Sequence, residues 1–216
     1  MEIPAPDPRE GFDVVVLASS AGGVRALQTV ISPLPTAFPT PIVVVQHRRP
    51  DSLDLLTGIL RARAALPVRP ATDGPLRPGV TVLPPGASAQ LGSTGTITIR
   101  PAPATRTADG VLTSAAAAFG PRVLCVVLTG RLDDGAAGVR AVRLAGGRVL
   151  VQDPDEAEAP GMPSAALATG CVEHALPLSH IAPALVAYTM APGAANLLTV
   201  PVPPWARLRL GRGVPA

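Results

Sequence analysis

The chain has 216 residues, a formal net charge of +3 and a hydrophobic fraction of 47%, enough for one substantial domain with a packed core. Aromatic residues make up only 2% of it, and its positive charge is carried by scattered arginines, without any lysine, which argues against a nucleic-acid-binding protein. Residues 1–11 lack a signal-peptide pattern, and no apolar run reaches the ~20 residues of a membrane helix. We therefore expect a cytoplasmic protein that does not insert into membranes.

Residues 13–23 form the first predicted unit, a buried strand that runs into a turn of small residues. The strand leads to Ser19 and Ser20, and the turn continues through Gly22 and Gly23 to a segment with helical apolar spacing, 24–32. In an open α/β fold such a unit places its turn at the carboxyl edge of the sheet, where ligands bind. The turn on its own fits either a nucleophile or an anion-binding loop.

A second unit of the same kind follows. A buried strand over 41–46 ends at His47, and the next helix has Asp51 or Ser52 as its cap. Its predicted apolar stripe consists of Leu53, Leu56, Ile59 and Leu60. In contrast, 66–100 contains turn signals between short alternating runs, which predicts an antiparallel hairpin region. Those runs are 80–83, 89–91 and 96–100.

The alternation of strands and helices then resumes and gives the fold class. After a loop over 101–108, we expect helices over 110–119 and 136–145, a short one ending near 170, and one from Ser179 as cap to about 189. We expect strands over 122–128, 148–152 and 171–175. The prediction is a doubly wound, mostly parallel α/β sheet with an antiparallel hairpin insertion. Residues 1–12 form a lead, 13–190 the domain and 191–216 a proline- and glycine-rich tail.

Two cysteines, Cys125 and Cys171, each lie in an apolar, strand-like run. Buried apolar positions are common for free cysteines. We therefore expect two buried thiols rather than a disulfide or a redox pair.

Serine, histidine and aspartate follow three of the predicted strands. Ser19 or Ser20 follows the first, His47 the second, and Asp133 or Asp134 a later one. A serine hydroxyl becomes nucleophilic when an imidazole takes its proton, and a carboxylate orients that imidazole. The same residues also have structural interpretations, because a serine can cap the following helix and a strand-end histidine can be structural.

Two familiar motifs are missing from the first turn. It lacks the Gly-x-Ser-x-Gly elbow of α/β-hydrolases, since Ala18 and Gly22 flank Ser20 at two positions. It also lacks Gly-x-Gly-x-x-Gly, which argues against a nucleotide-binding domain.

The turns instead resemble those of the chemotaxis protein-glutamate methylesterases, the CheB family. The family's Gly-Ala-Ser-Thr-Gly-Gly turn corresponds to residues 18–23, and its Gln-His motif to Gln46-His47. Its Leu-Thr-Gly-Met-Gly-x-Asp-Gly-Ala-x-Gly motif corresponds to 128–138. Glycine and proline positions agree in order from about residue 13 to 188.

This resemblance implies a catalytic triad of Ser20, His47 and Asp134. It implies that the turn around the oxyanion is supported by Ala21, Gly22, Gly23 and Arg131. The reaction would be hydrolysis of glutamate methyl esters on the cytoplasmic helices of methylated chemoreceptors, or on another methyl-ester protein, with glutamine deamidation as a second activity. No metal or cofactor is implied. Only residues 1–12 precede the first strand, so we expect no receiver domain in this chain.

Departures from the family pattern motivate an alternative, a catalytically weakened domain that acts as a regulatory or binding module. Ala21 stands at the family's threonine, and Arg131-Leu132 at its Met-Gly pair. A separation of Ser20 and His47 beyond hydrogen-bond reach would favour this alternative, although apo sites can be loose. The arginines Arg48, Arg49 and Arg131 are expected to be a solvated rim; alternatively they bind an acidic receptor surface, or Arg131 pairs with Asp134.

Overall fold

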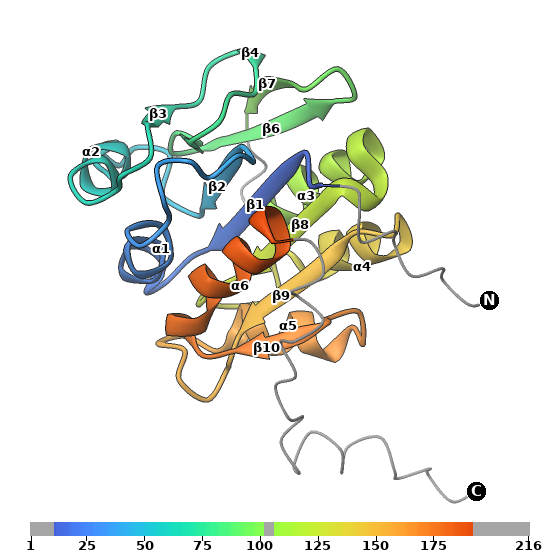
Figure 1. Cartoon of the computed structure of the whole chain (residues 1–216). Helices are drawn as coiled ribbons and strands as arrows, with labels where there is room; N and C mark the ends of the chain where they lie inside the picture. Colours follow the sequence, from blue (N-terminus) through green and yellow to red (C-terminus); the bar gives the residue numbers. More distant parts are fainter. Residues whose placement is uncertain (1–10, 102–105, 192–216) are drawn as a thin grey trace, which may run out of the picture.

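The structure is a computed structural model that describes residues 11–101 and 106–191. The fold is built on a seven-stranded sheet (Figure 1). The strand order is β10-β9-β8-β1-β2-β5-β3, and all six pairs are parallel. The strands are β1 (Val14–Ser19), β2 (Ile42–Gln46), β3 (Val68–Pro70), β5 (Val80–Val82), β8 (Val123–Val127), β9 (Arg148–Gln152) and β10 (His174–Leu176).

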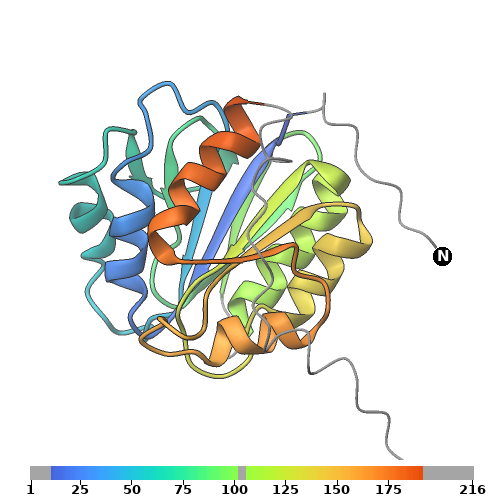
Figure 2. The same ribbon diagram turned by 60° about the horizontal axis from the view of Figure 1, so that its bottom comes forward.

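Strand β1 lies at the centre of the sheet and is fully buried because both of its faces are apolar. Val15 and Leu17 pack into a core with α1, α2 and α6. Val16 and Ala18 pack into a second core, with α3, α4 and α5, on the opposite face (Figure 2). The helices are α1 (Gly23–Ile31), α2 (Leu56–Arg61), α3 (Thr107–Phe119), α4 (Ala136–Leu144), α5 (Gly161–Ala168) and α6 (Leu178–Met190).

The point at which the connections reverse lies between β1 and β8. From β1 the chain passes through α1 to β2 on one side, and from β8 it passes through α4 to β9 on the other. These two helices cover opposite faces of the sheet. In open α/β sheets, ligands bind at the carboxyl ends of the strands at such a reversal. The segments that follow β1, β2 and β8 therefore lie at the edge where a site is expected.

A small antiparallel sheet of β4 (Gly74–Pro75), β6 (Ala87–Gly92) and β7 (Thr96–Pro101) forms the predicted hairpin insertion. Its apolar side chains Ala89, Leu91 and Ile97 join the core that contains α3. The predicted fold class is thus confirmed. One assignment is wrong, because the run 80–83 belongs to the parallel sheet as β5, between β2 and β3. Three residues that are buried on both faces do not reveal their sheet by alternation alone.

Several predicted boundaries are also wrong. Helix α2 begins at Leu56 without a side-chain cap, and Leu53, expected in its apolar stripe, is 81% exposed. Ile59 is exposed too. Helix α3 starts at Thr107, inside the predicted loop, and β10 is shifted toward the C-terminus. In α6 the cap position belongs to Pro177 rather than Ser179, because the helix already begins at Leu178. The expected tail and most of the lead lie outside the described residues.

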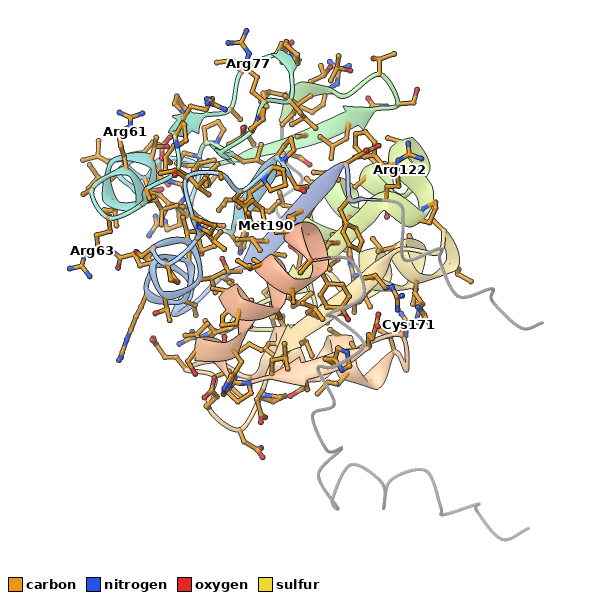
Figure 3. All side chains as sticks on the ribbon, viewed as in Figure 1. Arg61, Arg63, Arg77, Arg122, Cys171 and Met190 are labelled. Atoms are coloured by element: carbon orange, nitrogen blue, oxygen red, sulfur yellow. The ribbon has the colours of Figure 1, made fainter. Side chains whose placement is uncertain are left out.

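Both cysteines are free. Cys125 is fully buried in β8, and burial raises the pKa of its thiol. Cys171 is only half-buried, so the prediction of a buried thiol is wrong there (Figure 3). Figure 3 also shows Arg61, Arg77 and Arg122 at separate places around the molecule. In the part of the chain that the structure describes, every helix is too short or too polar to cross a membrane.

Substitution of Gly138 tests the packing of α3 on α4. An added Cβ would lie 2.5 Å from the Cβ of Leu112 and 3.2 Å from the Cα of Asp109. We expect Gly138→Ala to lower the free energy of unfolding by about 1–3 kcal/mol in urea denaturation, since overpacking forces the helices apart. Gly58→Ala is the matched control, because nothing lies within 4 Å of its Cβ. A Gly138→Ala protein as stable as the wild type would contradict this account of the packing.

Candidate active site

Ser20 and His47 directly follow two neighbouring strands in matching register. Ser19 pairs with Gln46 as the last residues of β1 and β2, and the His47 N–H donates to the Ser19 carbonyl at 2.9 Å. Adjacent strands lie about 4.8 Å apart, so Ser20 and His47 are neighbours at the sheet edge. The Ser20 N–H donates to the carbonyl of Thr129 at 3.0 Å, which ties the same turn to the end of β8.

The Gln46 side chain joins the backbones of these two residues. Its amide Nε2 donates to the carbonyl of Ser20 at 2.7 Å and to the carbonyl of His47, the residue after Gln46, at 3.2 Å. Its Oε1 accepts a hydrogen bond from the hydroxyl of Ser19 at 2.6 Å. Ser19 is 1% exposed, and its hydroxyl is committed to Gln46. Of the two serines, Ser20 is therefore the one that can meet a substrate. It is half-buried, and its hydroxyl makes no hydrogen bond to any described residue.

The glycines after the serines make this connection possible. Gly22 has a φ of 76°, the left-handed conformation that favours glycine. At Gly23 a Cβ would lie 2.0 Å from Oε1 of Gln46, so only glycine fits against that amide. The Gly23 N–H donates to the Ser20 carbonyl, whereas within the described chain the N–H groups of Ala21 and Gly22 donate to no acceptor. Free N–H groups next to a nucleophile are suited to stabilising an oxyanion.

The carboxylate of Asp134 caps α3. Its two oxygens accept the N–H groups of Ala108 and Asp109, both at 3.0 Å. Asp109 in turn caps α4, since its Oδ1 accepts from Gly135 at 3.0 Å and from Gly138 at 2.8 Å. The two helices therefore cap each other, and this satisfies N–H groups that a helix start otherwise leaves without partners.

Arg106 binds the capping residue Asp109 from the solvent side. Its guanidinium donates to Oδ2 of Asp109 at 3.0 Å and to Oδ2 of Asp133 at 3.2 Å. The hydrogen bond to Asp109, together with the nearby charge of Asp133, raises the pKa of Arg106. Asp133 is thus an exposed ion-pair partner, whereas Asp134 is held in the interhelical caps.

The three predicted triad residues lie at one sheet edge, but no hydrogen bond joins them. The side chain of His47 is exposed and has no hydrogen-bond partner among the described residues, and Asp134 bonds to α3 rather than to His47. The alternative pairing of Arg131 with Asp134 is wrong, because Arg131 is exposed and forms no ion pair in the described ranges.

The prediction that Arg48 belongs to a solvated rim is also wrong. Its side chain is 12% exposed, pairs with Asp54 at 2.6 Å and donates to the carbonyl of Leu83. It therefore holds the loop after His47 against the end of β5. Arg49 does lie in solvent, 3.5 Å from Asp51.

Sequence reasoning missed the positioning roles of Gln46 and Asp109. A polar residue at the end of a fully apolar strand was a signal for Gln46. The partners of Asp109 lie 26 and 29 residues further along the chain, so its capping role depends on contacts that a local pattern does not contain.

A cavity of about 340 Å³ opens at the same sheet edge, beside α1 and α6. None of the three predicted triad residues lines it. Its walls are Gly22, Arg25, Ala26, Thr29, Thr129, Gln152, Glu156, Glu158, Leu178 and Ser179.

Comparisons with known proteins agree on one family. The family model described as CheB methylesterase matches residues 15–185. A protein-glutamate methylesterase/protein-glutamine glutaminase of Moorella thermoacetica is 37% identical over 201 residues, which cover 87% of this chain and 47% of that protein. A second protein of this description, from Anaeromyxobacter dehalogenans, is 40% identical over 187 residues, 84% of this chain and 54% of that protein. The chain thus spans about half the length of these curated relatives.

A solved structure of the same family also matches the chain. The crystal structure of the Thermotoga maritima CheB methylesterase catalytic domain matches with a TM-score of 0.76 and 32% sequence identity. The match covers 82% of this chain and 98% of the Thermotoga chain.

Removing the Asp109 carboxylate tests the mutual capping. We expect Asp109→Ala to lower the free energy of unfolding by about 1–3 kcal/mol, because it leaves buried N–H groups of Gly135 and Gly138 without acceptors. Asp109→Asn keeps one oxygen acceptor and should lose less. Asp133→Ala, which removes only an exposed ion pair, should change stability by less than about 1 kcal/mol. Equal losses for Asp109→Ala and Asp133→Ala in urea denaturation would rule the cap out.

Proposed function

The chain belongs to the CheB methylesterase family, and on this premise we propose that it is a serine esterase. Its substrates would be glutamate methyl esters on methylated chemoreceptors or on another methylated protein, with glutamine deamidation as a second activity. The observation that carries the proposal is the register of β1 and β2, which makes Ser20 and His47 neighbours at the sheet edge. We assign this activity to residues 13–190.

In the proposed mechanism, His47 takes the hydroxyl proton of Ser20 while Oγ attacks the ester carbonyl. The tetrahedral intermediate collapses, and methanol leaves with the proton that His47 returns. A water molecule, deprotonated by His47, then attacks the carbonyl carbon of the acyl group; the bond to Ser20 Oγ breaks, and His47 returns the proton to that oxygen. This releases the glutamate side chain as a carboxylic acid, which ionises at neutral pH, and restores the serine. One ester and one water thus yield one acid and one methanol.

Backbone groups in two turns are suited to stabilise the negative oxygen of the intermediate. The N–H of Ala21 immediately follows the nucleophile, and that of Arg131 lies in the turn after β8; both lack acceptors in the described part of the chain. Gly130 brings this second turn against the first, since a Cβ there would lie 3.0 Å from the Cβ of Ser20. Because only N–H groups are needed, the substitutions at Ala21 and Arg131 leave the donors in place.

Asp134 is proposed to orient the imidazole of His47 and stabilise its charged form. Each of its oxygens accepts one hydrogen bond from α3, and a carboxylate oxygen can accept two. The carboxylate therefore retains acceptor capacity while the caps fix its position. Catalytic hydrogen bonds are often long in apo structures and tighten when substrate binds.

A second candidate function is a binding module with weakened catalysis. It is favoured by the absence of a hydrogen bond between Ser20 and His47 among the described side chains. Such a module would bind a methylated receptor without releasing methanol.

Methanol release from the methylated cytoplasmic fragment of a chemoreceptor distinguishes the two. We expect the wild type to release methanol, and Ser20→Ala and His47→Ala each to slow release by at least about a thousandfold. His180→Ala is the control, because His180 is exposed on α6. Release that persists in Ser20→Ala would refute the assignment. Binding without release by the wild type would support the module.

A further inference from the structure

Leu132 combines a strained backbone with an exposed apolar side chain. Its backbone has a φ of 63°, in the left-handed region, and Leu132 and Arg106 are the non-glycine residues with positive φ in the described ranges. The Cβ of an L-residue is strained in this conformation. Its side chain is also 76% exposed, although it is large and apolar. Arg106 differs, because its side chain holds two carboxylates.

The surrounding structure imposes this conformation. The Gly130 N–H donates to Ala159 and the Gly130 carbonyl accepts from Met162, both at 2.8 Å, which fixes the start of the turn. Gly161 packs directly on the backbone of Leu132, where a Cβ would lie 2.6 Å from its nitrogen. On the other side, Asp134 is held by α3. These contacts hold the backbone of the turn in place, while most of the leucine side chain lies in solvent.

A glycine would adopt the imposed conformation without strain, so a leucine at this position, at a sheet edge with candidate catalytic groups, indicates a functional role. Leu132 lies next to Arg131, whose N–H is proposed for the oxyanion site, and two residues before Asp134. Other exposed leucines, Leu53 at 81% and Leu55 at 61%, lie in the loop that follows His47. Exposed apolar side chains thus occur in both turns that supply proposed catalytic groups.

We propose that Leu132 is a specificity-determining residue whose side chain packs on an apolar side chain of the substrate protein, beside the esterified glutamate. This inference rests on the proposed function for the identity of the substrate, but its binding step does not depend on catalysis. The contact buries apolar surface only in the complex, which accounts for an exposed leucine in a conformation that favours glycine.

Two substitutions separate the side chain from the backbone. Leu132→Gly removes both the apolar surface and the strain, so we expect the melting temperature to rise by about 2–4 °C. Leu132→Ala removes only the apolar surface and should leave the melting temperature close to that of the wild type. Both should weaken binding of the methylated chemoreceptor fragment by about tenfold. Leu144→Ala is the matched control, because Leu144 is 74% exposed at the end of α4, on the opposite edge of the sheet.

Binding is measured by calorimetry in a Ser20→Ala background, where no turnover occurs, with KM and kcat measured in parallel on the active protein. The proposal predicts that in Leu132→Ala the KM for the methylated fragment rises by a larger factor than kcat falls, whereas Leu144→Ala leaves both constants and the hydrolysis of a small methyl ester at their wild-type values. Unchanged affinity in both Leu132 variants, or no binding of the fragment at all, would overturn it. Hydrolysis of neither substrate by the wild type would instead refute the proposed function, while the binding arm still decides the role of Leu132.

Discussion

Strand β1 is paired on both edges and buried on both faces, and the site follows from this constraint. A strand with parallel neighbours on each side and helices above and below has no free position for a functional group within its length. Its carboxyl end is the first place where a side chain can meet solvent. Because β2 and β8 run parallel to β1 in close register, their ends lie beside it. Ser20, His47 and the turn before Asp134 are brought to one edge for this reason.

Two sets of buried and part-buried hydrogen bonds then hold these neighbouring residues in a defined arrangement. The amide of Gln46 fixes the backbones of Ser20 and His47, and the mutual caps of Asp109 and Asp134 fix the two helices of the other face. Buried polar groups are expensive to leave without partners, so both arrangements resist distortion. Between these two sets, Leu132 adopts a positive φ, the backbone conformation that favours glycine.

The sequence alone was sufficient for the parts of the fold that local pattern decides. Continuous apolar runs identified β1, β2 and β8, and the motif spacing identified the residues at their ends. It failed where tertiary packing decides. The short β5 is buried on both faces, so its pattern did not reveal that it joins the parallel sheet. Helix α2 begins only at Leu56, after a loop in which Arg48 pairs with Asp54. The partner of Asp134 could not be predicted, since α3 and α4 meet only in the folded protein.

The proposed mechanism requires Ser20 to become acylated, and covalent labelling can identify the serine that reacts. The wild type is incubated with a fluorophosphonate, which reacts with activated serines, and the tryptic peptide 10–25, which contains both Ser19 and Ser20, is sequenced by mass spectrometry. We predict one adduct, on Ser20, that is lost in His47→Ala. An adduct on Ser19 or on another serine, in a protein that hydrolyses methyl esters, would contradict the account.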